Sequence, residues 1–142
     1  MSGASLRAAT GARRPRRRPG ENRAGLIIAG TIEFGLHGYA GAQTSAIAVR
    51  AGVSQPNVYA NFASKRELFL ACVGELPLVV EQLTPSEQLE EQHALLLFQA
   101  VAAVREPALS PELGELLHEL RSNLGAARFS GALSAAAAIL LR

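Results

Sequence analysis

A short polar stretch, SQPNVYANF, contains the residues whose types and spacing could do chemistry. Gln55 and Asn57 carry amides that both donate and accept hydrogen bonds, and the Tyr59 hydroxyl can do the same. A core helix would avoid so many amides, and a solvated helix would use Glu and Lys instead. Gln and Asn pair bidentately with adenine edges, and an apolar edge such as Pro56 can contact a thymine methyl group. The stretch predicts a surface that binds polar groups. The most specific candidate for the bound group is the base edges of DNA.

Other kinds of site have little support in the sequence. His37, His93 and His118 are isolated, without the ligand spacing of a metal site, so we expect no bound metal. Cys72 is the single cysteine, which excludes an internal disulfide and is typical of a small core residue. There is no aspartate, no glycine-rich phosphate loop and no nucleophile beside a base. We therefore expect no catalytic site, no cofactor and no enzyme.

The charges are distributed unevenly along the chain. Residues 1–66 hold ten Lys and Arg against two Glu, a balance of +8, whereas residues 67–142 hold four Arg against ten Glu, a balance of −6. The basic half begins with RRPRRRPG, five arginines in eight positions broken by two prolines. Such a segment buries nothing, so we predict a disordered arginine-rich arm at residues 1–20. It is either an arm that adds salt-sensitive affinity for nucleic acid or a solvated tail.

No apolar stretch approaches the ~18 residues that a membrane-spanning helix needs. The N-terminal arginines are not followed by the apolar segment of a secretory signal. We therefore expect no membrane association. A cytoplasmic location fits the single cysteine, because a reducing compartment suits an unpaired thiol.

The polar stretch needs helices to hold it in place. Apolar spacing predicts a first helix over residues 22–37, which Gly38 ends, and a second over residues 44–51. Gly52 permits a sharp turn, after which Ser54 caps a third helix that ends near Asn61. Two short helices joined by such a turn make a helix-turn-helix plausible, with residues 54–61 as the helix that enters the major groove. Tyr59 and Lys65 would donate to phosphate, which sets register rather than sequence.

Further helices follow in the second half. SKRE at residues 64–67 is a capping box, and the helix it opens is interrupted or ended at Pro77. TPSE at residues 84–87 repeats the pattern and predicts a long helix to about Arg105. SPE at residues 110–112 begins a helix to about Leu124, which Gly125 ends, and residues 126–142 form one more short helix. The chain is thus predicted to be all-α.

The residues of the first half resemble a known family. They are similar to the DNA-binding domain of TetR-family transcriptional regulators. The similar positions are Thr44, Ile47-Ala48, Ala51-Gly52-Val53-Ser54-Gln55-Pro56-Asn57-Val58-Tyr59, Phe62, Ser64-Lys65 and Leu68-Phe69. Residues 34–39, FGLHGY, resemble the end of the first helix of that family. The resemblance covers about residues 23–73. It implies an all-helical, homodimeric repressor whose C-terminal domain binds a small effector and then releases a near-palindromic DNA operator.

The resemblance also implies roles for individual residues. Thr44, Tyr59 and Lys65 are expected to contact phosphates. Base reading is expected from Ser45, Gln55, Pro56 and Asn57, on a helix that Ser54 begins. Ser54 and Asn61 are also expected to contact DNA, and Asn61 stands where the family commonly has histidine or tyrosine. Glu33 stands where the family has an apolar residue, so we expect it to be solvated at a helix edge or to weaken the first helix.

The second half resembles the family less fully. Residues 93–124 are similar to the central helices of its ligand domain, whereas the closing helix pair is short or absent before Arg142. We therefore predict a helix-turn-helix DNA-binding domain at residues 21–66 and a shortened helical regulatory and dimerisation domain at residues 67–142. The apolar stripe at residues 95–102 is typical of a core. As the alternative, Leu95, Phe98, Val101 and Leu116 line a pocket for a small apolar effector.

Two hypotheses follow for the whole chain. In the first, the chain is a DNA-binding transcriptional regulator, a repressor that a small-molecule effector releases from its operator. In the second, it is a truncated helical interaction protein that binds DNA only non-specifically or through a full-length partner. A lone helix-turn-helix would give only non-specific affinity, roughly 10⁻⁴–10⁻⁶ M at physiological salt.

Overall fold

The structure, a computed structural model, describes residues 20–142 and is all-helical over that range, as predicted. The predicted arm at residues 1–20 lies outside the described residues except for Gly20. In chain order the helices are α2 (Glu21–Gly41), α3 (Thr44–Ala51), α4 (Gln55–Asn61), α5 (Lys65–Gly74), α6 (Leu76–Glu81), α7 (Glu91–Ala102), α8 (Glu112–Leu124) and α9 (Ala126–Leu140). Of the helices between residues 20 and 142, none is long and apolar enough to cross a membrane.

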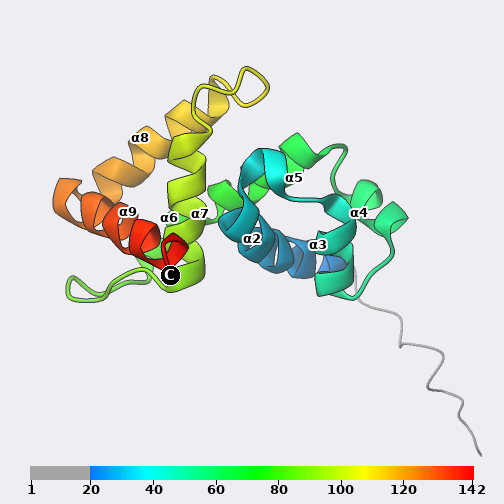
Figure 1. Cartoon of the computed structure of the whole chain (residues 1–142), viewed down its shortest axis with the longest axis horizontal. Helices are drawn as coiled ribbons and strands as arrows, with labels where there is room; N and C mark the ends of the chain where they lie inside the picture. The colour runs from blue at the N-terminus through cyan, green and yellow to red at the C-terminus, as the bar shows by residue number, and fades with distance from the viewer. Residues whose placement is uncertain (1–19) are drawn as a thin grey trace, which may run out of the picture.

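The helices form two adjoining groups (Figure 1). The first group is α2 to α5, in which α2 packs against both α3 and α5. The second contains α7, α8 and α9, and α6 packs against α8. Helix α2 also packs along α7, so the first helix of one group is the main contact with the other.

One hydrophobic core runs through both groups. Phe34 of α2 meets Phe69 of α5 edge-on, with ring centres 4.9 Å apart. On the other side, Leu96 of α7 and Leu113 and Leu120 of α8 are fully buried. Helix α5 contacts α2, α7 and α8. The predicted division of the chain after residue 66 stays a prediction.

Close approach of α2 to α7 depends on a glycine. A Cβ atom at Gly35 would lie 3.1 Å from the Leu95 Cβ and 3.4 Å from the Leu96 backbone nitrogen. The Gln99 side-chain amide of α7 donates to the Gly35 carbonyl at 3.2 Å. The glycine lowers the intrinsic helix propensity of α2, but it lets the two helix backbones come together.

Several helix boundaries follow their sequence signals. Helix α3 has the predicted bounds, Ser54 and Ser64 cap α4 and α5, and Gly125 ends α8 at a φ of 83°. Gly38 interrupts α2, with φ 78° and ψ 171°, although helix resumes briefly to Gly41. Pro77 lies in the first turn of a separate helix, α6, where its missing N–H is tolerated.

The predicted long helix from residue 84 to Arg105 is wrong at its start. Helix α7 begins only at Glu91, and residues 84–87 form a turn closed by a 3.0 Å bond from the Glu87 N–H to the Thr84 carbonyl. The physical reason is a tertiary contact. Arg128 of α9 donates to the Glu87 carbonyl at 2.8 Å, which satisfies an acceptor that a continuing helix would have used.

Candidate nucleic-acid interface

Helix α4 is built by local signals in the polar stretch. Ser54 is extended, and its hydroxyl accepts from the Asn57 N–H at 3.4 Å. Gly52 adopts a φ of 74° in the turn before it, a conformation that suits glycine. Val58 and Phe62 are buried, as their four-residue spacing predicts, and fix which face of α4 looks outward. The turn and the two helices α3 and α4 make the predicted helix-turn-helix.

A hydrogen-bonded cluster joins the outward faces of α3 and α4. The Thr44 Oγ1 lies 3.0 Å from the Tyr59 hydroxyl, and the Gln55 amide donates to the same Thr44 oxygen at 3.0 Å. Tyr59 is 48% exposed and Gln55 is exposed. The structure thus brings together three predicted DNA-contacting residues that lie apart in the sequence. Each retains hydrogen-bonding capacity toward solvent, because an amide and two hydroxyls offer more donors and acceptors than these bonds use.

Ser45, Ser54 and Pro56 are also exposed around the start of α4. Ser45 lies in the first turn of α3, and Pro56 lies in the first turn of α4. The exposed candidates for base contact therefore come from the N-terminal ends of two adjoining helices. This is the end of a recognition helix that reaches base edges in helix-turn-helix proteins.

Asn57 and Asn61 are only half-exposed. The Asn57 Oδ1 accepts from the Asn22 amide at 3.0 Å and from the Asn61 amide at 3.1 Å. Asn61 also donates to the Asn57 carbonyl at 2.9 Å. The bond from Asn22 ties α4 to the start of α2, and the two bonds from Asn61 lie within α4. Asn57 therefore has a structural role beside any role in base reading.

Lys65 lies at the start of α5 and bridges to the end of α2. Its ammonium group donates to the Ala42 carbonyl at 3.1 Å and to the Ala40 carbonyl at 3.3 Å. It also lies 5.0 Å from the centre of the Tyr39 ring, within range of a cation–π contact. A phosphate contact by Lys65 stays a prediction. The ammonium group would have to bond the phosphate in addition to the two carbonyls.

Sequence reasoning missed an ion pair that connects α2 to α3. Glu33, expected to be solvated, is buried, and its Oε1 accepts from the Arg50 Nη2 at 2.6 Å. The Arg50 Nε donates to the same oxygen at 3.2 Å, and the His37 Nε2 lies 3.7 Å from Glu33 Oε2. The expectation failed because a partner 17 positions away supplies the charge that a buried carboxylate needs. The signal in the sequence was an acid at a buried helical position together with an arginine in the last turn of α3.

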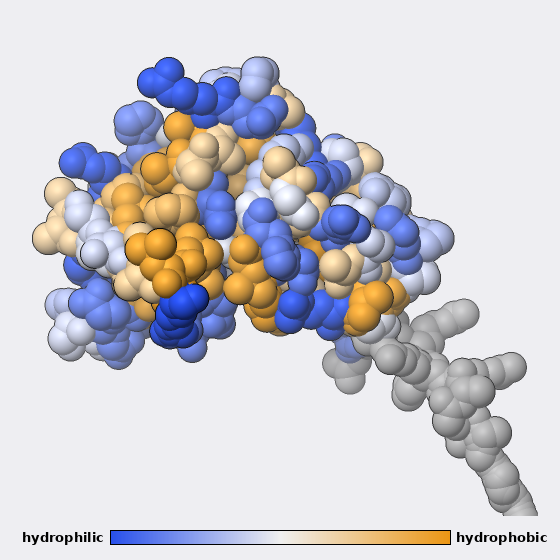
Figure 2. All heavy atoms as spheres, viewed as in Figure 1, coloured by the Kyte–Doolittle hydropathy of each residue, from blue (hydrophilic) through white to orange (hydrophobic). Residues whose placement is uncertain are grey.

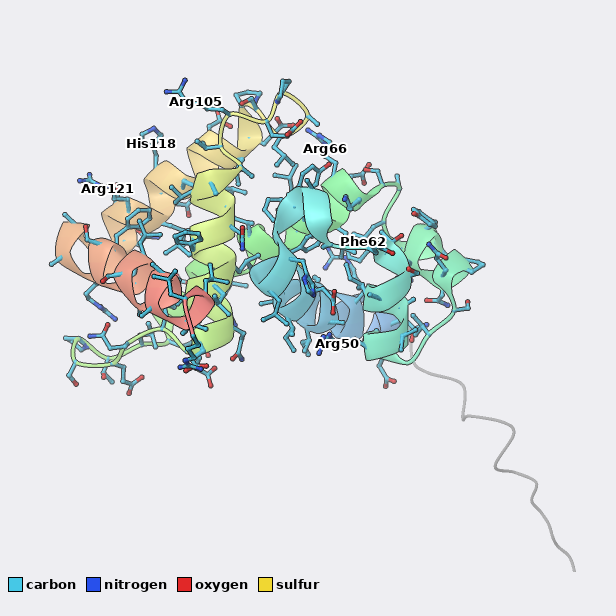
Figure 3. All side chains as sticks on the ribbon, in the orientation of Figure 1. Arg50, Phe62, Arg66, Arg105, His118 and Arg121 are labelled. Atoms are coloured by element: carbon cyan, nitrogen blue, oxygen red, sulfur yellow. The ribbon has the colours of Figure 1, made fainter. Side chains whose placement is uncertain are left out.

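A second contact links α5 to the second group of helices. The Arg66 guanidinium donates to the Ala108 carbonyl and to the Glu112 carboxylate of α8 (Figure 3). Figure 3 also shows Phe62 turned into the first helical group, whereas Arg105, His118 and Arg121 point outward from the second. The helix that follows the recognition helix is thus attached to α8 by a charged contact.

The four residues predicted to line a pocket lie outside a cavity of about 390 Å³ that the fold encloses between α2, α5, α6 and α7. Leu95 is buried in the core, and the other three, Phe98, Val101 and Leu116, pack against that core. None of the four lines this cavity. Their role at an effector pocket stays a prediction. Between residues 20 and 142 no three His, Cys, Asp or Glu side chains group as metal ligands would.

An all-helical fold, a helix-turn-helix and an exposed polar cluster on its recognition helix together define a DNA-binding domain of the helix-turn-helix class. Comparison with known proteins agrees. The family described as bacterial regulatory proteins of the tetR family matches residues 26–72. Residues 26–72 therefore form a DNA-binding domain of the TetR family of transcriptional regulators, and the predicted family is confirmed for this part of the chain.

Two curated relatives each match about half of the chain. The HTH-type transcriptional activator FasR of Mycolicibacterium smegmatis is 48% identical over 66 residues, which cover 46% of this chain and 30% of that protein. The HTH-type transcriptional regulator YdgC of Bacillus subtilis is 36% identical over 70 residues, which cover 49% of this chain and 36% of that protein. The match thus spans about a third of each relative. Both names are those of regulators, in agreement with the prediction that the chain is not an enzyme.

A solved structure agrees on the fold. The crystal structure of a TetR-family transcriptional regulator from Mesorhizobium loti superposes with a TM-score of 0.58 at 21% identity, covering 85% of this chain and 68% of that one. The likeness extends beyond the helix-turn-helix into the second group of helices. At this identity it supports the shared fold, not a shared ligand.

Proposed function

We propose that the protein is a transcriptional regulator that binds double-stranded DNA through α3 and α4. The observation that carries the proposal is the exposed cluster of Thr44, Gln55 and Tyr59, placed on a helix-turn-helix of the TetR family. Gln55 reads a base edge, with Ser45, Ser54 and Pro56 beside it. Thr44 and Tyr59 bond phosphates on either side and so fix the register of α4 in the major groove.

The proposal includes a pair of copies on one operator. Two recognition helices about one DNA turn apart read a near-palindromic site, because the two-fold axis of a dimer imposes its symmetry on the DNA. Apolar surface over α9 supports such pairing (Figure 2). Leu140 and Leu141 at its end are 39% and 86% exposed, and a second copy would cover them.

The proposed regulatory action is repression in the cytoplasm, relieved when a small effector binds the second group of helices. Two contacts support a mechanical link between the groups. Gln99 holds the Gly35 carbonyl of α2, and Arg66 of α5 holds Glu112 of α8. A shift of α7 or α8 would therefore move the helices that flank the recognition helix. The relative FasR is named an activator, so activation from the same site is the second outcome that a transcription assay distinguishes.

Protection of DNA from cleavage tests the proposal. The purified chain is footprinted at physiological salt on DNA flanking its own gene and on sites selected from a random pool. A protected, two-fold symmetric site is the expected result. Diffuse protection that disappears as salt is added would show charge-driven binding alone. That result would favour the alternative, a helical interaction protein that needs a full-length partner.

A further inference from the structure

A cavity lies where the DNA-binding helices meet the second group. Its volume is about 390 Å³, within the range of small-molecule sites. The walls come from α2, the end of α5, α6 and the start of α7. The apolar lining includes Ile27, Ile32 and Leu76, and Ile28, which is 65% exposed, stands at an opening to solvent.

The polar groups of the lining are all able to accept hydrogen bonds. They are Thr31, Glu75, Gln92 and His93. The Nδ1 atom of His93 is buried and has no hydrogen-bond partner among the described residues, and the Glu90 Oε1 lies 3.8 Å from it. Burial lowers the pKa of His93, against an opposing effect of Glu90, so the imidazole is neutral at neutral pH and one ring nitrogen can accept. A buried ring nitrogen without a partner favours a ligand that supplies one.

The charge of the lining selects among ligands. Glu75 contributes a carboxylate, and no lysine or arginine between residues 20 and 142 lines the cavity. Glu75 makes no ion pair with the described residues. Arg23 shares a neighbouring hollow with Glu75, but its guanidinium lies over the Phe62 ring, 5.1 Å from the ring centre. The lining therefore favours a cation over an anion.

We propose that this cavity binds a small apolar amine. The ammonium group lies at Glu75, where it also donates to acceptors of the opposite wall such as His93. The hydrocarbon part lies among Ile27, Ile32 and Leu76. Anionic ligands of the same size are rejected, because the described lining offers them a carboxylate and no cation.

The site has a consequence for regulation, and this step rests on the proposed function. Ile27, Thr31 and Ile32 belong to α2, which also packs against α3 and, through Asn22, against α4. A ligand that separates α2 from α6 and α7 would therefore shift the helix that holds the recognition helix. The amine would act at the junction of the two helical groups and lower affinity for DNA.

Three probes of matched skeleton test the site without DNA. Phenethylamine is a cation at neutral pH, phenethyl alcohol is neutral and phenylacetate is an anion. Binding is followed by the methyl signals of the five isoleucines. Ile27, Ile28 and Ile32 line the cavity, and Ile47 and Ile139 serve as internal controls. We expect the amine to shift the first three signals and to bind about threefold or more tightly than phenylacetate, as suits a partly exposed ion pair.

Variants test whether Glu75 causes the preference for the amine. Glu75→Gln should abolish the advantage of the amine over the alcohol while leaving alcohol binding unchanged. Glu81→Gln changes an exposed acid at the end of α6, outside the lining, so it is the matched control and should behave like the wild type. Val79→Phe fills the cavity and should remove the response to both ligands. Unchanged Ile47 and Ile139 signals show that each variant is folded.

The outcomes distinguish the amine site from the proposed effect of the amine on DNA affinity. If none of the probes shifts the three cavity methyls, or if phenylacetate binds as well as the amine, the site is refuted. If the amine binds but leaves DNA affinity unchanged, the regulatory step is refuted and the amine site stands. If the chain binds no specific DNA while the methyl shifts occur, the proposed function fails and the amine site stands.

Discussion

Glu33 of α2 and Arg50 of α3 form a close ion pair, with Oε1 and Nη2 2.6 Å apart. The Glu33 side chain is 8% exposed and that of Arg50 is 39% exposed. Removing one partner therefore has a different consequence for each remaining charge. A lone Glu33 carboxylate would stay buried, whereas a lone Arg50 could turn to water.

This asymmetry predicts unequal losses of stability. Arg50→Met leaves a buried charge without its partner and should lower the free energy of unfolding by about 2–4 kcal/mol. Glu33→Leu should cost less, because it leaves an arginine with access to solvent. The double variant should be more stable than Arg50→Met alone. Urea unfolding measures all three, and equal losses in the two single variants would contradict the burial of Glu33.

Two glycines should respond in opposite directions to alanine. Gly35→Ala places a Cβ atom 3.1 Å from the Leu95 Cβ, so α2 and α7 must separate, at a cost of about 1–3 kcal/mol. Gly114 lies within α8, and a Cβ atom there meets nothing within 4 Å. Gly114→Ala should therefore stabilise the fold by about 0.5–1 kcal/mol through helix propensity. Thermal unfolding of both variants checks the pair, and a stabilising Gly35→Ala would refute the close packing.

His93 predicts a dependence of stability on pH. Its pKa is lowered from 6.5 by burial, although Glu90 acts in the opposite direction and Glu75 lines the same cavity. The unfolded chain therefore binds a proton at His93 more readily than the folded chain. As pH falls through 6.5, this difference favours unfolding.

The comparison that isolates His93 is between the wild type and His93→Gln. The melting temperature of the wild type should fall more between pH 7.5 and pH 5.5, the range that spans the ordinary pKa of histidine. Other acids titrate in both proteins and cancel in the difference. An equal fall in both proteins would show that the imidazole is free to take up its proton in the fold.

Cys72 should be unreactive while the protein is folded. Burial raises the pKa of its thiol to about 12, and the Sγ donates to the Ile27 carbonyl at 3.5 Å. Alkylation requires the thiolate, which is scarce in the fold at pH 8 and abundant in an unfolded chain of thiol pKa about 8.5. Iodoacetamide labelling, followed by mass spectrometry across a urea series, should therefore report unfolding. Fast labelling without urea would contradict the burial of this residue.

The part of the fold best predicted from sequence is the part set by local signals. Ser54 and Ser64 cap the helices that follow them, and Gly52 makes the turn, because each acts within three or four residues. The spacing of Val58 and Phe62 also predicted correctly which face of α4 is buried. These features place the exposed cluster of Thr44, Gln55 and Tyr59.

The features that sequence reasoning missed depend on partners far along the chain. Glu33 is buried because Arg50 lies beside it in space. The 84–87 pattern does not start a helix because Arg128 binds a carbonyl there. Asn57 is held by Asn22. The cavity gathers residues of four elements, so no single helical stripe could have predicted it.

The central claim is that α4 reads base edges, and Gln55→Ala tests it most directly. Gln55 is exposed and its side-chain bond to Thr44 lies at the surface, so the variant should unfold as the wild type does. Affinities are measured at one physiological salt concentration for the selected operator and for its single-base variants. We expect Gln55→Ala to lose about 1–3 kcal/mol of discrimination at one base pair of each half-site and to keep it elsewhere. Equal weakening on every sequence, or no change at all, would contradict base reading by α4.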